Sequence, residues 1–223
     1  MNIHILKHMG ALKAVINVSL YVALGDSITA GYGVASPFSF PNVYGNYLGR
    51  HDKDLRILNL GINGLTTRGL LNLLKSNRGL RHSLSQASLI TLTIGSNDLL
   101  RLMGNSHQSL NPAQIPLIYA NMAKTLELVG QEIRLLSPNA TVKVATLYNP
   151  LTEWGPYAHY YRLAQEMIDN SNAMIIRWAK GFGFVVVYVD REFKGKERLL
   201  TGQDQAHPNA VGYQVIAKAF SRY

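Results

Sequence analysis

The chain has 223 residues, a length that suits one domain built around a single hydrophobic core. It contains no cysteine, which excludes disulfides, thiolate metal sites and cysteine nucleophiles, and no apolar run reaches the ~18 residues that a membrane-spanning helix needs. The net charge is +9, but lysine and arginine are scattered singly, so we expect a solvated basic surface and no nucleic-acid site.

The start of the chain carries two lysines ahead of an apolar stretch, an order that also occurs in secretory signal peptides. That stretch contains the first predicted strand, so cleavage after it would remove part of the sheet. We therefore expect no signal peptide and favour a cytoplasmic location. Residues 1–17 are interpreted as an N-terminal extension that need not be ordered, and residues 18–223 as one domain.

Short apolar segments alternate with amphipathic segments along the rest of the chain. In chain order, the pattern predicts strands at 18–24, 55–60, 89–94, 141–147 and 184–189, separated and followed by helices at 43–50, 66–75, 115–136, 161–178 and 208–220. The strands are apolar throughout, which is typical of parallel strands buried on both faces. The alternation predicts an α/β fold, a doubly wound parallel sheet between two layers of helices.

A serine follows the first predicted strand at once, in the sequence Gly25-Asp26-Ser27. This position at the start of a turn or helix suits a nucleophile whose own backbone N–H can face an anion. The alternative is an N-cap serine, a common role after a strand. We expect Asp26 to hold the turn through hydrogen bonds to nearby amides.

A nucleophilic serine needs a base and a group that orients the base. His207 is the candidate base, because Pro208 places it on a loop just ahead of the last helix. Asp204, three residues earlier, can bring a carboxylate against the imidazole. The alternative is an ordinary surface turn, and Asp190, at the end of the fifth strand, is a rival for the orienting acid.

Two further polar stretches follow the second and third strands, Asn59-Leu60-Gly61-Ile62-Asn63-Gly64 and Thr93-Ile94-Gly95-Ser96-Asn97-Asp98. The missing side chain of Gly61 would let its N–H approach a substrate oxygen, and the amide of Asn97 could donate to the same oxygen. The alternatives are a plain turn glycine and a local Asx turn.

Together, the four stretches resemble the four sequence blocks of the SGNH hydrolases, also called GDSL-type esterases and lipases, in the right order. The resemblance implies the flavodoxin-like strand order 2-1-3-4-5, a catalytic triad of Ser27, Asp204 and His207, and an oxyanion hole made by Ser27, Gly61 and Asn97. Thr29 stands where an α/β-hydrolase nucleophile elbow has its second glycine, which disfavours that other fold.

Two long connections, 99–116 and 149–160, are predicted to leave the sheet on the side that carries Ser27. We expect them to wall the substrate crevice, and the candidate substrate-binding residues are Leu99, Met103, Trp154 and Tyr157. Such a wall suits an acyl chain. The same aromatic side chains could instead stack on a sugar, or simply pack the loops onto the core.

The expected function is that of a serine esterase or lipase, which hydrolyses carboxylic esters of short to medium acyl chains through an acyl-enzyme. The alternatives are a carbohydrate O-deacetylase, a phospholipase or thioesterase, and a non-catalytic ligand-binding module. The partner is a small-molecule ester, and the sequence leaves the oligomeric state open. No cofactor is required, and the remaining histidines show no metal-ligand spacing, so no metal is expected.

Overall fold

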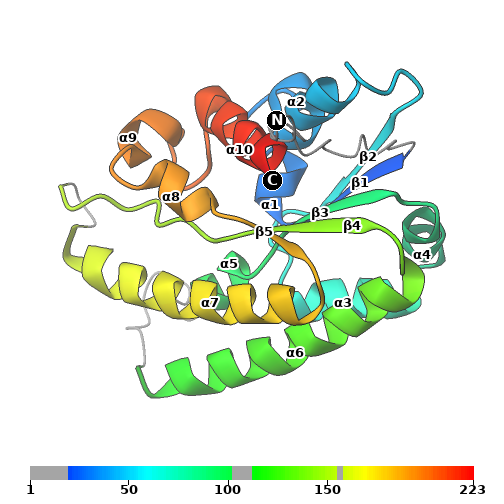
Figure 1. Ribbon diagram of the computed structural model, residues 1–223. Helices are drawn as coiled ribbons and strands as arrows, with labels where there is room; N and C mark the ends of the chain where they lie inside the picture. Colours follow the sequence, from blue (N-terminus) through cyan, green and yellow to red (C-terminus); the bar gives the residue numbers. More distant parts are fainter. Residues whose placement is uncertain (1–19, 102–111, 155–157) are drawn as a thin grey trace, which may run out of the picture.

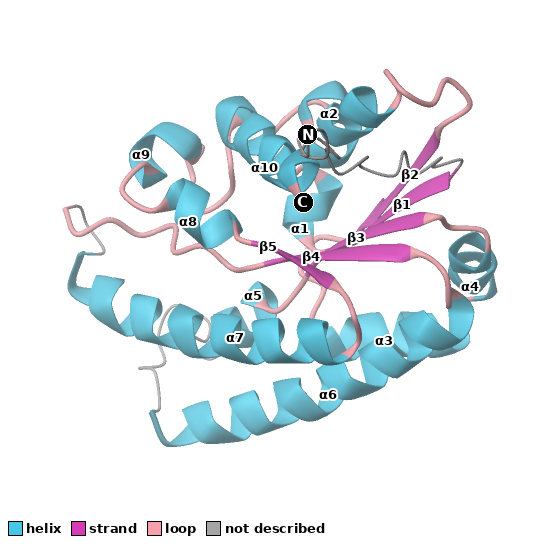
Figure 2. Cartoon of the chain, viewed as in Figure 1, coloured by secondary structure: helices cyan, strands magenta, loops and turns pink. Residues whose placement is uncertain are grey.

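The computed structural model describes residues 20–101, 112–154 and 158–223. They form a three-layer α/β sandwich in which a central sheet lies between two groups of helices (Figures 1 and 2). The interpretation of residues 1–17 as an extension falls outside the described residues.

The sheet has five parallel strands in the order β2-β1-β3-β4-β5, which confirms the predicted topology. The strands are β1 (Leu20–Gly25), β2 (Arg56–Gly61), β3 (Leu89–Thr93), β4 (Thr141–Ala145) and β5 (Val185–Val187). The last two are shorter than predicted. β4 ends early because the backbone N–H and carbonyl groups of Leu147 bind the side chain of Asn172 instead of a neighbouring strand. β5 ends early because the chain enters a helix at Val189.

Two groups of helices cover the two faces of the sheet. On one face lie α2 (Phe40–Leu48), α8 (Val189–Phe193), α9 (Glu197–Leu200) and α10 (Ala210–Arg222). On the other lie α3 (Thr67–Ser76), α4 (Arg78–Ser85), α6 (Ile115–Leu136) and α7 (Tyr161–Gly181). The five predicted helices are present, and α4 is one that the pattern did not predict. The short helices α1 (Ser27–Ala30) and α5 (Ser96–Leu100) follow β1 and β3 directly.

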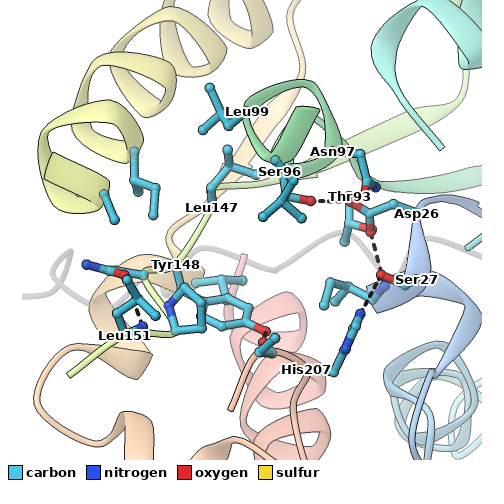
Figure 3. Close-up of a pocket in the computed structure, with 18 of the residues that line it drawn as sticks. Asp26, Ser27, Thr93, Ser96, Asn97, Leu99, Leu147, Tyr148, Leu151 and His207 are labelled. Atoms are coloured by element: carbon cyan, nitrogen blue, oxygen red, sulfur yellow. Dashed lines mark hydrogen bonds between the residues drawn. The ribbon is translucent and has the colours of Figure 1, made fainter. Parts of the chain in front are cut away.

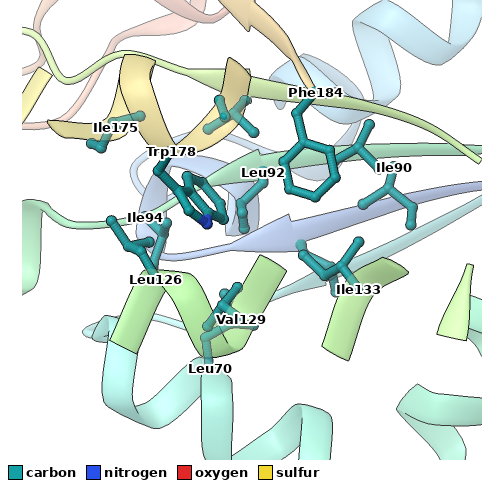
Figure 4. Close-up of a cluster of buried hydrophobic side chains, with 14 of the residues drawn as sticks. Leu70, Ile90, Leu92, Ile94, Leu126, Val129, Ile133, Ile175, Trp178 and Phe184 are labelled. Atoms are coloured by element: carbon teal, nitrogen blue, oxygen red, sulfur yellow. The ribbon is translucent and has the colours of Figure 1, made fainter. Parts of the chain in front are cut away.

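Each face of the sheet has its own hydrophobic core. The larger core packs the sheet against α3, α6 and α7, and Trp178 and Phe184 lie at its centre with their rings edge to face, 5.5 Å apart (Figure 4). The smaller core packs the sheet against α2 and α10, where Phe40 stacks on Phe220 at 5.0 Å. β1 is apolar on both faces, as expected for a buried parallel strand. β3 and β4 instead alternate, because Ile90, Leu92, Val142 and Val144 face the larger core while Thr91 and Lys143 point to the smaller one.

The sharp exit from β1 sets the position of the nucleophile. Gly25 has φ +146°, and a Cβ built there would lie 2.3 Å from the carbonyl oxygen of Thr93, so no other residue fits without movement. The turn brings α1 to the carboxyl edge of the sheet, between β2 and β3, where a strand-order reversal opens a crevice.

Candidate active site

Asp26 holds the turn that carries Ser27, as expected from the sequence. It caps α1 by accepting a hydrogen bond from the N–H of Ile28 (3.1 Å), and its two oxygens also accept from the hydroxyls of Thr93 (2.9 Å) and Ser96 (2.8 Å). Burial raises the pKa of Asp26, and the hydrogen bonds from Ser96 and Thr93 lower it again in part. This fully buried carboxyl group thus ties the first turn of α1 to β3 and α5.

His207 reaches Ser27 from a loop 180 residues further along the chain. The loop is closed by an antiparallel bridge between Thr201 and Pro208 and by a hydrogen bond from the N–H of Gly202 to the carbonyl oxygen of His207 (2.8 Å). Its imidazole Nε2 lies 3.0 Å from Ser27 Oγ (Figure 3). Ser27 is 8% exposed, so its hydroxyl sits at the bottom of the crevice.

Asp204 contacts the other nitrogen of the same imidazole. Its Oδ2 lies 2.6 Å from His207 Nδ1, and its Oδ1 accepts hydrogen bonds from the backbone N–H groups of Ala206 (3.1 Å) and His207 (3.0 Å). Burial alone would raise the pKa of Asp204, but the hydrogen bonds from the His207 ring and the two amides outweigh it and hold the pKa below its usual value. The rival Asp190 instead accepts a hydrogen bond from Thr146 Oγ1 (2.5 Å).

Two tyrosines that the sequence reasoning missed support the His207 loop. The ring of Tyr32 lies 4.4 Å from the imidazole of His207, centre to centre. The hydroxyl of Tyr148 donates to the carbonyl oxygen of Ala206 (2.6 Å), and its ring stacks on Phe193 at 4.1 Å. Tyr148 does carry a sequence signal, because it follows β4 at the carboxyl edge of the sheet.

Asn97 is held at the same crevice by its own side chain. Its amide Nδ2 donates one hydrogen to the carbonyl oxygen of Leu65 (2.9 Å), in the stretch that follows β2. An amide NH2 has two hydrogens, so the second is left for a ligand. Asn97 and Ser27 line one pocket.

The structure corrects the expectation for Gly61. Its N–H donates to the side chain of Asn59 (3.0 Å), and a Cβ built on Gly61 would lie 2.1 Å from the backbone nitrogen of Ala30, so this glycine is needed for contact with α1. Gly61 does not line the pocket, whereas Gly64 does. Gly64 has φ +76°, and its N–H finds no acceptor among the described residues. Gly64 replaces Gly61 as the candidate donor.

The pocket around Ser27 has a volume of about 670 Å³. Leu99, 7% exposed, is one of the residues that line it. Trp154 is 81% exposed and does not line it, so the structure does not bring this residue to the site. Met103 and Tyr157 lie outside the described residues. Leu151, in the connection 149–160 that was predicted to wall the crevice, also lines the pocket. The rest of the apolar wall includes side chains at the end of β4 and on α7 that were not predicted to line it: Leu147, Leu163, Ala164, Met167 and Ile168.

Comparison with known proteins places this chain in a family. The model of the GDSL-like lipase/acylhydrolase family matches residues 23–215, which include all four motif stretches. The chain belongs to this family. Its SGNH-type fold therefore agrees with the resemblance seen in the sequence.

Individual relatives are distant in sequence but similar over most of their length. The chain is 24% identical to the uncharacterized protein YpmR of Bacillus subtilis strain 168, over 88% of this chain and 77% of YpmR. It is 25% identical to the spore germination lipase LipC of Bacillus licheniformis, over 89% and 92%. The solved structure of the lipase Lip_vut3 from a goat rumen metagenome superposes with a TM-score of 0.79 at 22% identity, over 91% and 96%.

Two further findings concern other classes of site. Among the described ranges, no three histidine or acidic side chains gather in a way that could hold a metal ion. The helices of those ranges include none that is both long and apolar enough to cross a bilayer.

Proposed function

We propose that this GDSL family member is a serine hydrolase of carboxylic esters, with Ser27 as nucleophile, His207 as general base and Asp204 as the orienting acid. The observation that carries the proposal is the continuous chain of contacts from Ser27 Oγ to His207 Nε2 (3.0 Å) and from His207 Nδ1 to Asp204 (2.6 Å). Both distances are within hydrogen-bond reach, as transfer of the serine proton requires.

The acylation step follows from this arrangement. Ser27 Oγ attacks the ester carbonyl carbon while His207 Nε2 takes its proton, and the Asp204 carboxylate stabilises the imidazolium that forms. The imidazolium then gives the proton to the leaving alcohol, and the C–O bond to the alcohol breaks. His207 next takes a proton from water, the hydroxide attacks the acyl-enzyme, and the acid is released as Ser27 regains its proton.

The negative charge on the tetrahedral oxygen needs donors that are already in place. We assign this role to the backbone N–H groups of Ser27 and Gly64 and to the second amide hydrogen of Asn97. Support comes from their common position at the pocket, from the fixed side chain of Asn97, and from the lack of another acceptor for the two N–H groups within the described residues. Each such donor is typically worth about 3 to 4 kcal/mol in the transition state.

The character of the pocket favours an ester with an apolar acyl group. Beyond the triad and the oxyanion donors, its lining combines leucine, isoleucine, methionine and alanine side chains with three tyrosines, Tyr32, Tyr148 and Tyr160. An acyl chain would bury apolar surface there at roughly 0.8 kcal/mol per methylene group. An acetylated sugar could contact the tyrosines but would leave the aliphatic side chains unused, so the acyl ester is preferred to the carbohydrate ester.

Labelling with a serine-directed fluorophosphonate tests the proposal. We expect a stoichiometric adduct at Ser27, loss of hydrolysis of an activated aryl ester, and neither labelling nor turnover in Ser27→Ala. Ser221→Ala, which changes an exposed serine of α10, is the matched control and should behave like the wild type. Labelling of another serine would reject the nucleophile, and ligand binding without any ester turnover would instead favour a non-catalytic binding module.

A further inference from the structure

The pocket does not end at the triad but crosses the edge of the sheet. Ser27 follows β1, Asn97 follows β3, and Leu147 follows β4, and all three line it. Because neighbouring strands lie about 4.8 Å apart, the pocket extends about 10 Å sideways from the nucleophile to the end of β4. In Figure 3 the labelled side chains run from Ser27 past Leu147 to Leu151.

Beyond β4, the wall of the pocket is the first part of α7. The side chain of Asn172 fixes this helix to the end of β4, because it accepts from the N–H of Leu147 (2.7 Å) and donates to its carbonyl oxygen (2.8 Å). A helix rises 1.5 Å per residue, so Ala164 lies about 12 Å from Asn172 along the axis, away from the sheet. The pocket-lining residues of α7 recur at spacings of three and four and so share one face: Leu163, Ala164, Met167 and Ile168.

The chain that follows β4 lines the same part of the pocket, and it is tied to the same helix. Asn149 donates to the side chain of Gln165 (3.2 Å) and to the carbonyl oxygen of Tyr161 (3.4 Å), and it accepts from the N–H of Leu151 (3.0 Å). These bonds hold the connection to the first two turns of α7, and the part of the pocket that both segments line forms a groove.

The groove differs chemically from the triad end of the pocket. The carboxylates in the lining, Asp26 and Asp204, both lie at the triad end, and the α7 and β4 walls carry no charged side chain. If a methylene group takes up about the volume of a water molecule, ~30 Å³, a cavity of 670 Å³ has room for roughly twenty such groups. This is more than a medium acyl chain and a small alcohol need.

We propose that the groove along α7 is a binding channel for the acyl chain of esters of long, unbranched fatty acids, and that Ala164 sets the chain length it accepts. The proposal rests on the proposed esterase function. Ala164 has the smallest side chain of the α7 wall and lies one turn further from the sheet than Met167 and Ile168. An acyl chain long enough to extend beyond Met167 and Ile168 must pass over the methyl group of Ala164.

The test is the chain-length profile of kcat/KM for p-nitrophenyl esters from acetyl to palmitoyl, below their critical micelle concentrations. In the wild type we expect kcat/KM to rise at least as far as the decanoyl ester. Ala164→Trp should stay within about twofold of the wild type on acetyl and butyryl esters and lose at least tenfold on decanoyl and longer ones. Ala164→Leu should move the cut-off less far.

The matched control is Ala173→Trp. This alanine is exposed and lies nine residues further along α7, hence on the opposite face of the helix, so the substitution should leave the whole profile unchanged. An unchanged profile in Ala164→Trp, an equal loss on all esters including acetyl, or a wild type that prefers acetyl would each overturn the channel while the esterase function stands. Failure of the wild type on every ester would reject the esterase function itself.

Discussion

At the scale of single residues, the candidate triad depends on an acid that is partly open to solvent. The Asp204 side chain is 42% exposed, so its strength as a partner for His207 comes from fixed geometry and not from burial. Two backbone N–H groups bind one of its oxygens and leave the other directed at His207 Nδ1. The acid is therefore positioned by its own loop.

Replacing this acid by an amide should expose its role. In Asp204→Asn the side-chain oxygen can keep the two backbone hydrogen bonds, so the NH2 group faces His207 Nδ1 and favours the tautomer protonated on Nε2, which cannot accept the serine proton. We expect kcat to fall by about 10²- to 10⁴-fold, with an unchanged melting temperature. The control is Asp190→Asn, which alters a carboxylate bound to Thr146; a larger loss of kcat in this folded variant would make Asp190 the acid.

At the scale of elements, one buried lysine joins a strand to two helices. Lys143, in the middle of β4 and 8% exposed, donates to the hydroxyl of Tyr44 in α2 (2.8 Å) and to the carbonyl oxygen of Phe220 near the end of α10 (3.0 Å). The carbonyl groups in the last turn of a helix lack intrahelical partners, so the ammonium group caps α10. Burial lowers the pKa of Lys143 to about 8.

This lowered pKa predicts a pH dependence of stability. Below pH 8 the lysine is protonated in both states, and between pH 8 and the ordinary lysine pKa of 10.5 the unfolded chain binds a proton that the folded chain does not. The free energy of unfolding should therefore rise over this window, by about 1 to 3 kcal/mol. Urea unfolding of the wild type and Lys143→Met between pH 7 and 10 measures it. Other groups cancel in the difference, and a difference that is constant with pH would contradict the prediction.

The strands, helices and loops also show how much of the fold and of the candidate site could be predicted from the sequence. The candidate positions Ser27, Asp204 and His207 come from motifs that each stand beside a recognisable strand or helix, whereas the strand order was implied by the resemblance to the SGNH hydrolases. The choice between Gly61 and Gly64 could not be made, because both follow β2 and only their dihedral angles and contacts decide which N–H faces the pocket. Trp154 belongs to a connection that was predicted to wall the crevice, but the sequence does not show which way the side chain of a loop residue points.

At the scale of the whole molecule, the candidate site is assembled from opposite ends of the chain and both layers of helices. Ser27 belongs to the start of the described fold, His207 precedes the last helix, and the apolar wall comes from α7 in the other layer. A site built in this way should exist only while the sheet and both cores are intact.

This dependence makes cooperative unfolding of a single domain testable with the two tryptophans of the chain. Trp154 is exposed, whereas Trp178 of α7 is buried in the larger core, so Trp154→Phe leaves one fluorescent reporter inside that core. Ester hydrolysis by the candidate triad reports on the smaller core, because His207 is held beside α10. In the Trp154→Phe protein, Trp178 fluorescence and initial rates of ester hydrolysis should give urea midpoints that agree within about 0.2 M, as expected for two-state unfolding. Loss of activity at a clearly lower urea concentration than loss of the Trp178 signal would mean that the α10 side unfolds separately, and residues 18–223 would then not behave as one cooperative domain.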